Sequence, residues 1–225
     1  RILSSIRKHT QDRVIIVSNF TSTLNLLQRY CVRQKFPFLR LDGRTKADVR
    51  SKMVNEFNSD SGSDHLGKQP FVFLLSSKSG GVGLNLIGAN RLVLFDSDWN
   101  PATDRQAMAR IHRDGQLKPC FIYRLLLVGS MDEKIYQRQI TKIGLSDSLM
   151  SNETAKDNDV ATSSDTFSQE ELRDVFGYHP NTTCLTHDLL GCVCGGNGKE
   201  VQTQVEQPSK VENFTLPGFV SASKL

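Results

Sequence analysis

Short apolar runs alternate with helical segments along the first part of the chain, and this alternation limits the fold more than any other feature. The runs are Val14–Val17, Phe38–Leu41, Phe71–Leu75, Arg91–Phe95 and Cys120–Leu125. Apolar residues at helical spacing follow the first run at Leu24, Leu27 and Tyr30, and further helices are predicted near 45–57 and 101–112. Alternating strands and helices predict an α/β fold in which helices cover both faces of a parallel sheet.

Length and composition limit the size class and the partners of the chain. Its 225 residues can hold one sizeable core and a small appendage. A formal net charge of +4 and a sequence pI near 8.8 are compatible with a nucleic-acid partner, although the clustering of charge matters more than its sum. No apolar run approaches the ~18–20 residues that cross a bilayer, so we expect a soluble, intracellular protein without a membrane partner. Because the chain begins at Arg1 without a methionine, we expect a fragment of a longer protein.

Three polar motifs are predicted near the carboxyl ends of the strands, where parallel sheets bind ligands. They are the Gly-rich segment Ser76–Asn85, the segment Asp96–Pro101, and Q-A-M-A-R-I-H-R-D-G-Q over Gln106–Gln116. Glycines make a flexible backbone cradle. Arg110 and Arg113 stand three apart and would present two guanidinium groups on one helical face. A planar guanidinium suits the charge on a transferring phosphoryl group, whereas the alternative is an ordinary solvated basic face.

Together the three motifs resemble the second motor lobe of superfamily-two helicases, and most closely the Swi/Snf-type group of double-stranded DNA translocases. The resemblance covers roughly residues 1–145 and implies a RecA-like fold for this helicase C-terminal lobe. Asp114 stands where most chromatin remodellers have an aliphatic residue, which is similar to the recombination-repair translocases of the Rad-fifty-four type. Further similar segments are Ile122–Leu126, Glu133–Ile140 and Thr186–Leu190, the last of which is nearest to the B paralogue.

The resemblance implies ATP with Mg²⁺ as the cofactor, in a site shared with a first lobe. The phosphate-binding loop and magnesium carboxylates of a first lobe are absent from these residues, so we predict that the chain alone is inactive. Arg113 would be the finger on the γ-phosphate, with Arg110 as its companion and Gln106 orienting them or the nucleotide. The loop residues that face the nucleotide would be Gly81, Gly83 and Asn85. For Asn85, a turn-stabilising side chain is the alternative.

The resemblance also implies a surface that grips the phosphates of DNA, which carry no sequence information. Its residues would be Ser18, Asn19, Thr21, Arg44, Thr45, Lys46, Ser76, Ser77 and Lys78. Each hydroxyl alone is better explained as a helix cap, but the set favours phosphate contacts. Trp99, the only tryptophan, could stack on nucleic acid. Because we expect Pro101 to begin a helix, we favour Trp99 packing beneath the Gly-rich segment, where it would couple nucleotide to DNA.

The C-terminal part contains a cluster of metal-ligand residue types. Three thiolates and one imidazole suit tetrahedral Zn²⁺, which would stabilise a short appendage, and the ligands would be Cys184, His187, Cys192 and Cys194. The C-x-C spacing is less usual than C-x-x-C, and His179 is a substitute ligand. The alternative is a set of reduced surface cysteines. Cys31 and Cys120 lie in apolar segments and are most simply small core residues.

The predicted organisation has four parts. They are the RecA-like lobe over 1–145, a linker over 146–166, a small appendage over 167–196 and a disordered tail over 197–225. Within the lobe, 59–69 reads as an exposed loop, and 130–145 reads as a helix that leaves the sheet and braces it. A capping box predicts a short helix after Ser168.

These features predict the second motor lobe of an ATP-dependent, nuclear translocase of double-stranded DNA that acts in homologous recombination and double-strand-break repair. The partners implied by the resemblance are double-stranded DNA, a strand-exchange recombinase and the first helicase lobe of the same parent chain. A nucleosome-remodelling ATPase lobe is one alternative. A non-catalytic module that binds DNA or a partner is another, and the intact set of Gln106, Arg110 and Arg113 argues against it.

Overall fold

A five-stranded sheet forms the centre of the computed structural model, which describes residues 1–59, 69–79, 83–140, 169–190, 201–202 and 215–216. All neighbouring strands are parallel, in the order β2-β3-β1-β4-β5. The strands are β1 (Val14–Ser18), β2 (Phe38–Leu41), β3 (Val72–Ser76), β4 (Arg91–Leu94) and β5 (Phe121–Arg124). The predicted α/β class with a parallel sheet is confirmed, and each apolar run became a strand.

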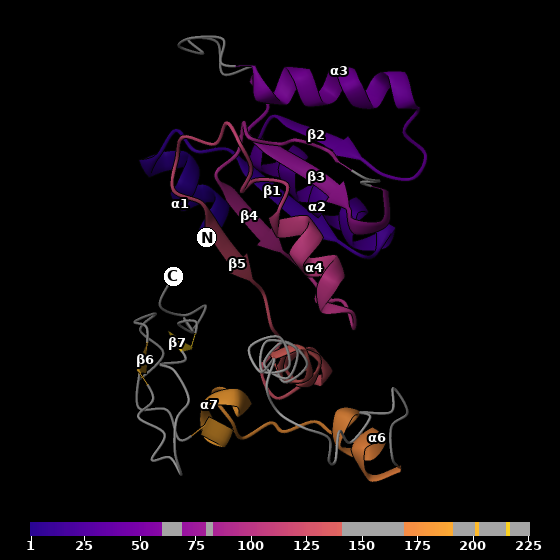
Figure 1. Cartoon of the computed structure of the whole chain (residues 1–225), viewed down its shortest axis with the longest axis vertical. Helices are drawn as coiled ribbons and strands as arrows, with labels where there is room; N and C mark the ends of the chain where they lie inside the picture. Colours follow the sequence, from indigo (N-terminus) through magenta and orange to yellow (C-terminus); the bar gives the residue numbers. More distant parts are fainter. Residues whose placement is uncertain (60–68, 80–82, 141–168, 191–200, 203–214, 217–225) are drawn as a thin grey trace, which may run out of the picture.

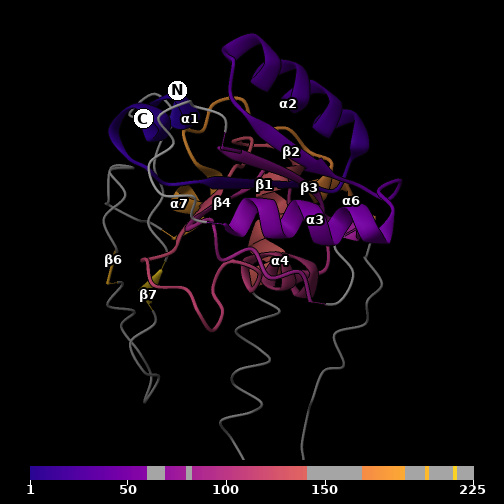
Figure 2. The same ribbon diagram turned by 90° about the horizontal axis from the view of Figure 1, so that it is seen from above.

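Helices cover both faces of this sheet, as Figure 2 shows. One face carries α1 (Ile2–His9) and α2 (Thr21–Gln34), and the other carries α3 (Ala47–Asn58) and α4 (Pro101–Met108). The side chains of β1 alternate between two cores: Ile15 belongs to the α3 and α4 side, and Ile16 to the α1 and α2 side. A central strand buried on both faces explains why its sequence is an uninterrupted apolar run.

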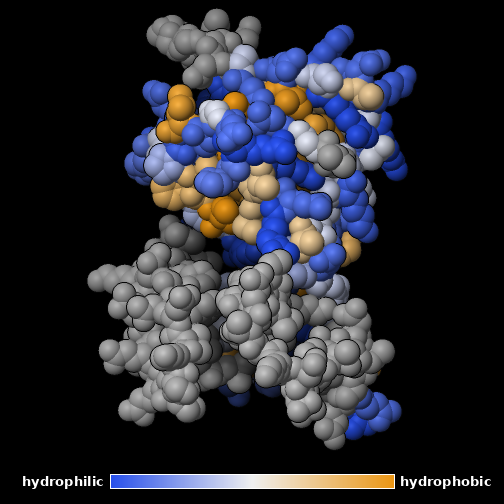
Figure 3. Space-filling model, in the orientation of Figure 1, coloured by the Kyte–Doolittle hydropathy of each residue, from blue (hydrophilic) through white to orange (hydrophobic). Residues whose placement is uncertain are grey.

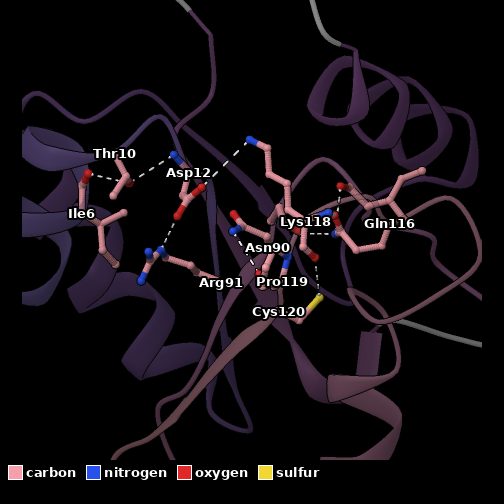
Figure 4. Close-up of polar contacts among 11 residues, drawn as sticks. Ile6, Thr10, Asp12, Asn90, Arg91, Gln116, Lys118, Pro119 and Cys120 are labelled. Carbon is pink, nitrogen blue, oxygen red and sulfur yellow. Dashed lines mark hydrogen bonds and ion pairs between the residues drawn. The ribbon is translucent and has the colours of Figure 1, made fainter.

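The amino end of the sheet is closed by polar contacts between the segments that enter β1, β4 and β5 (Figure 4). The carboxylate of Asp12 accepts a hydrogen bond from Arg91 Nε at 2.6 Å and lies 4.0 Å from Lys118 Nζ. Asn90 Nδ2 donates to Pro119 O at 3.2 Å. These contacts fasten the starts of three strands to one another, so this end of the sheet is a structural seam.

Beyond β5 the chain leaves the sheet and enters a helix over 131–140, as predicted for 130–145 up to the limit of the described residues. Two short helices follow, α6 (Gln169–Val175) and α7 (Leu185–Leu190), and Figure 1 shows them beyond the carboxyl end of β5. The helix predicted after the capping box is therefore present as α6. The predicted linker over 146–166 lies outside the described residues.

Two short strands lie within the range predicted to be a disordered tail. They are β6 (Val201–Gln202) and β7 (Thr215–Leu216), which pair antiparallel. The other residues of 197–225 lie outside the described part of the chain, so the disorder of the tail stays a prediction. The helix α1 was not predicted from the sequence.

The surface of the sheet-bearing part is mainly hydrophilic, with separate apolar areas between the charged residues (Figure 3). In the part of the chain that the structure describes, no helix combines the length and the apolar character needed to span a membrane.

The two cysteines predicted to be core residues differ in burial. Cys31 is fully buried, whereas Cys120 is only partly buried.

Candidate functional site

The carboxyl ends of β1, β3 and β4 meet in one group of hydrogen-bonded polar residues. Ser18 Oγ donates to Asp96 Oδ2 at 2.5 Å, and the Asn19 backbone N–H donates to Asp96 Oδ1 at 2.6 Å. Ser77 Oγ donates to Asn19 Oδ1, which brings in the segment after β3. Parallel strands end at one edge of a sheet, which is why residues so distant in sequence become neighbours. Of the predicted DNA-facing residues, Ser18, Asn19 and Ser77 are therefore brought together, and Asp96 joins them.

Two further predicted loops are tied together by Arg50 of α3. Its Nε donates to Thr45 O at 2.8 Å and its Nη1 donates to Ser79 O at 3.2 Å. Ser79 ends the short 3₁₀ helix η1 (Ser77–Ser79), which directly follows β3. The loops after β2 and β3, which are predicted to contact DNA phosphates, thus form one surface. Its exposed basic side chains are Arg44, Lys46 and Lys78.

The loop after β2 is held from within by Asp42. Its Oδ1 accepts the backbone N–H of Arg44 at 3.0 Å, and its own N–H donates to Thr45 Oγ1 at 3.2 Å. The hydrogen bond from the Arg44 backbone is the largest of the influences that hold the pKa of Asp42 below its ordinary value. A charged Asp42 therefore fixes the turn, and the hydroxyl of Thr45 has a structural role here.

Of the two predicted finger residues, Arg113 contacts the Gly-rich segment with its side chain, and Arg110 contacts Leu86, just after that segment, with its backbone. Arg113 Nη1 donates to Gly83 O at 3.1 Å, and Leu86 N donates to Arg110 O at 3.1 Å. Arg110 is only 8% exposed, whereas Arg113 is exposed to solvent. Burial, and then the nearby charge of Arg113, lowers the pKa of Arg110. Two like charges held together in this way favour an anionic ligand, because such a ligand relieves their repulsion.

The arrangement of the two arginines differs from the predicted helical face. The helix α4 ends at Met108, and the chain then forms turns in which Arg110 N bonds to Ala107 O at 3.3 Å. The N–H of Ile111 likewise bonds to the carbonyl three residues back, Met108 O, at 3.2 Å, so this last turn is wound more tightly than an α-helix. The predicted helix over 101–112 is therefore wrong in its last turn. Arg113 still contacts Gly83, and its charge lies close enough to Arg110 to lower the pKa of Arg110.

The Gly-rich segment is anchored by Asn58, the last residue of α3. Asn58 Nδ2 donates to Asn85 O at 2.8 Å, and Asn58 Oδ1 accepts the N–H of Gly88 at 2.9 Å. A side chain at Gly88 would place its Cβ 2.3 Å from Phe57 O, so only glycine fits this close approach. Asn85 Oδ1 is buried and accepts no hydrogen bond from the described residues. Its role as a nucleotide contact stays a prediction, and Gly81 lies outside the described residues.

Gln116, the last residue of the arginine motif, is a positioning residue that the sequence did not reveal. Its Nε2 donates to the carbonyls of Ala89 at 2.8 Å and of Ile87 and Ile111 at 3.2 Å, and its Oε1 accepts from Lys118 N at 3.0 Å. It thereby joins the arginine turns to the segment that carries Gly83 and Asn85. The motif contains this glutamine, but its contacts depend on chain segments far apart in sequence.

Trp99 is 45% exposed. Because residues 80–82 of the Gly-rich segment lie outside the described residues, packing of Trp99 beneath that segment stays a prediction. The next residue, Asn100, fixes the start of α4: its N–H donates to Asp98 Oδ1 at 2.8 Å, and its own Oδ1 accepts Ala102 N at 3.0 Å to cap the helix. Gln106 is exposed on α4, and its predicted orienting role stays a prediction.

The predicted zinc ligands are only partly within the described residues. Cys184 and His187 are described, whereas Cys192 and Cys194 lie outside. Among the described residues, no cluster of three or more potential ligands occurs. Cys184 Sγ donates to Glu133 Oε1 at 3.2 Å, and burial together with this carboxylate raises the pKa of the thiol to about 11. Zinc binding by Cys184 would require the loss of this proton, and the zinc site stays a prediction.

Comparisons with known proteins agree with the fold and with the motifs. Residues 1–115 match the family model described as the helicase conserved C-terminal domain. The chain is 47% identical over 201 residues to the DNA repair and recombination protein RDH54 of Saccharomyces cerevisiae, which covers 89% of this chain and 21% of that protein. It is 50% identical over 194 residues to the DNA repair and recombination protein RAD54B of Homo sapiens, with 85% and 20% covered.

A solved structure supports the same assignment. The crystal structure of the C-terminal part of the Fun30 ATPase domain matches with a TM-score of 0.56 and 38% sequence identity, over 61% of this chain and 42% of that one. The chain spans about a fifth of the length of the curated relatives named above. The family model, in turn, spans more than half of the chain. The chain therefore belongs to the helicase conserved C-terminal domain family, in the Swi/Snf-type group that includes the Rad-fifty-four type DNA repair and recombination proteins.

Proposed function

We propose that this chain is the second motor lobe of an ATP-driven translocase of double-stranded DNA that acts in homologous recombination and double-strand-break repair. The observation that carries the proposal is the contact of the Arg113 guanidinium with Gly83 of the Gly-rich segment, beside the second charge of the buried Arg110. The relatives named DNA repair and recombination proteins support the biological setting. The parent protein would contain a first lobe that binds most of the nucleotide.

In the nucleotide half of this proposal, Arg113 is the finger on the γ-phosphate. It is exposed and points its Nη1 at Gly83, so a phosphate brought by a closing first lobe can replace solvent around it. Arg110 supplies a second, less mobile charge, and Gln106 orients the pair or the nucleotide. Mg²⁺-ATP would supply the reacting phosphate, and the carboxylates for Mg²⁺ belong to the first lobe. Asn85 and Gly83 would form the wall that faces the nucleotide.

In the DNA half, the phosphate backbone would lie along the carboxyl ends of β1, β2 and β3. Backbone amides, hydroxyls and basic groups contact phosphates without reading sequence, as a translocase requires. The contacting residues in this proposal are Ser18, Asn19, Thr21, Arg44, Thr45, Lys46, Ser76, Ser77 and Lys78. Trp99, being partly exposed, would stack on the nucleic acid and couple DNA binding to the nucleotide site.

The wider assignments follow from the family and are proposals of the same kind. The protein would act in the nucleus beside a strand-exchange recombinase, whose filaments or joint molecules the motor would remodel. Cys184, His187, Cys192 and Cys194 would hold a structural Zn²⁺ in the appendage. Metal analysis of the purified chain, with Cys192→Ser as the comparison, tests the zinc assignment separately from the motor.

The finger role is tested in a protein that joins this chain to a first lobe. Arg113→Ala should lower DNA-stimulated ATP turnover by about 10³-fold, because the transition-state charge loses its fork of donors. Arg113→Lys should restore only a small part, since lysine is a point charge without that fork. DNA binding should survive in both variants. The measurement is steady-state ATP hydrolysis beside DNA affinity.

The matched control is Arg105→Ala. Arg105 is an exposed arginine in the last turn of α4, close in sequence to the motif. Its loss should leave ATP turnover within about two-fold, because salt in the solvent screens an exposed charge. An Arg113→Ala variant that keeps full turnover would remove the finger role. It would favour the non-catalytic module that binds DNA or a partner.

A further inference from the structure

The helix over 131–140 is fastened to the appendage by a buried carboxylate. Glu133 is 1% exposed and accepts hydrogen bonds from Gly129 N at 2.8 Å and from both Thr186 N and Thr186 Oγ1, at 2.7 and 2.9 Å. Burial alone would raise the pKa of Glu133, but the hydrogen bonds from Gly129, Thr186 and Cys184 outweigh it, and the pKa is lowered. A buried carboxylate with several donors is a fixed anchor, because each donor would otherwise lose a buried partner.

Further contacts join the same helix to the appendage. Gln137 Nε2 donates to Thr186 Oγ1 at 3.0 Å, and Lys134 Nζ lies 2.8 Å from the carboxylate of Asp174. Just before the helix, Gly129 O accepts the N–H of His179 at 2.9 Å, and a Cβ at Gly129 would lie 2.2 Å from His179 O. The segments 129–137 and 174–186 are thus packed as one unit. The predicted boundary between lobe and appendage is crossed by these contacts.

The other end of the helix is fastened to the motor lobe by Gln139, which is 2% exposed. Its Nε2 donates to Asp98 O at 2.5 Å and to Asp104 Oδ2 at 2.9 Å, and its Oε1 accepts from Arg124 Nη1 at 2.9 Å. Arg124 Nη1 also donates to Asp104 Oδ2 at 3.0 Å. The buried side chains of Gln139 and Asp104 and the partly buried side chain of Arg124 are therefore hydrogen-bonded to one another. Asp98 and Trp99 belong to the segment that this network holds.

The geometry of a helix makes the two anchors mechanically connected. Glu133 and Gln139 are six residues apart, which is about 9 Å along the axis and places them on different sides of the helix. A movement of the appendage that shifts Glu133 must therefore also move Gln139 or break its hydrogen bonds. The segment that such a movement would shift begins at Asp96, whose carboxylate accepts hydrogen bonds from Ser18 and Asn19.

We propose that the helix over 131–140 is a strut that transmits the docking of the appendage to the segment Asp96–Pro101, with Gln139 as the positioning residue. A partner or modification that displaces α6 and α7 would then change the DNA-facing end of the lobe. This regulatory consequence rests on the proposed motor function, whereas the mechanical coupling does not.

The chain contains a built-in probe of this coupling. Trp99 is the only tryptophan and directly follows Asp98, so the fluorescence of the chain reports this segment without ATP or a first lobe. Gln139→Leu keeps the volume but removes the donors to Asp98 and Asp104. We expect its Trp99 emission and acrylamide quenching to change. The amide N–H of Asp98, which donates to Asp104 Oδ1 at 3.4 Å, should exchange about ten-fold faster.

The decisive variants lie at the far end of the strut. Thr186→Val keeps the shape of the side chain and removes the hydroxyl shared by Glu133 and Gln137, and Glu133→Gln removes the carboxylate charge. Both should change Trp99 emission in the same direction as Gln139→Leu, with a smaller amplitude. If Glu133→Gln unfolds the appendage, Thr186→Val, the milder change, still gives the answer.

Asp12→Asn is the control, because it weakens a partly buried ion pair with Arg91 at the opposite end of the sheet. It should lower stability without altering Trp99 emission. A response of Trp99 to Gln139→Leu but to neither Thr186→Val nor Glu133→Gln would overturn the strut. A response to all variants including Asp12→Asn would also overturn it, by showing general loosening. The strut variants could change the Trp99 signal as expected while the unaltered two-lobe protein shows no DNA-stimulated ATP turnover. That result would support the coupling and reject only the motor function.

Discussion

Arg91, at the amino end of the sheet, and Arg113, beside the Gly-rich segment, carry the same guanidinium group in opposite environments. Arg91 enters β4 at the amino end of the sheet, where it pairs with Asp12, donates to the hydroxyl of Tyr123 and covers the ring of Phe121 at 4.5 Å. Arg113 is exposed, and its described hydrogen bond goes to the backbone carbonyl of Gly83. A carbonyl orients a guanidinium without neutralising it, whereas a carboxylate cancels its charge.

The contrast extends to the two edges of the sheet. At the amino edge, charged side chains are matched with one another and packed, which stabilises the fold. At the carboxyl edge, hydrogen bonds join the loops to one another, and basic side chains such as Lys46 and Lys78 remain exposed. Residue type alone therefore does not distinguish charged residues that stabilise the fold from charged residues that bind a ligand. The distinction comes from whether each charge is paired within the protein.

The largest effect on stability should come from the amino edge. Asp12→Ala should cost about 3 kcal/mol of unfolding free energy, because Arg91 would keep a largely buried charge without its carboxylate; both side chains are 15% exposed. Affinity for double-stranded DNA should be unchanged. Chemical denaturation and a DNA-binding titration measure the two quantities. Lys118→Ala, which removes a 58% exposed ammonium 4.0 Å from Asp12, is the control and should cost less than about 0.5 kcal/mol.

A smaller and more local effect is expected where the Gly-rich segment is anchored. Asn58→Ala removes the donor to Asn85 O and the acceptor for Gly88 N, and should cost about 1.5 kcal/mol. The amide of Gly88 should exchange about ten-fold faster, because its hydrogen bond is lost. Asn55→Ala, on an exposed turn of the same helix, should leave that amide unchanged. Equal exchange in both variants would mean that Asn58 does not hold the segment.

The smallest effect on stability, and a selective effect on binding, is expected at the carboxyl edge. Lys46→Ala and Lys78→Ala should each leave unfolding within about 0.5 kcal/mol. Each should reduce the slope of log affinity for DNA against log salt by about 1, because one phosphate contact is lost. Lys8→Ala, an exposed basic residue on α1, should leave that slope unchanged. Equal slopes in all three variants would move the DNA surface elsewhere.

The strands were predictable from the sequence because their signal is local. The run Val14–Val17 is apolar on both sides since β1 is central, and the other four strands begin and end within about one residue of their predicted runs. The motif residues Arg113 and Gly83 were also identified, and the structure brings them into contact.

The anchors of the site were not predictable, because their partners are far apart in sequence. Asn58 holds a segment 27–30 residues away, and Gln139 binds Asp98 from a distance of 41 residues. The turns after α4 also make a contact far apart in sequence, from Leu86 N to Arg110 O. Short-range patterns do not contain such information.

The half-site character of Arg110 and Arg113 is tested most directly by measuring DNA-stimulated ATP hydrolysis with and without a first lobe. The isolated chain should show no turnover above background, and joining it to a first lobe with an intact phosphate-binding loop should produce DNA-dependent turnover. That turnover should vanish when both arginines are replaced by alanine while the fold, followed by Trp99 fluorescence, persists. DNA-stimulated hydrolysis by the isolated chain, or full activity of the doubly substituted two-lobe protein, would contradict the assignment.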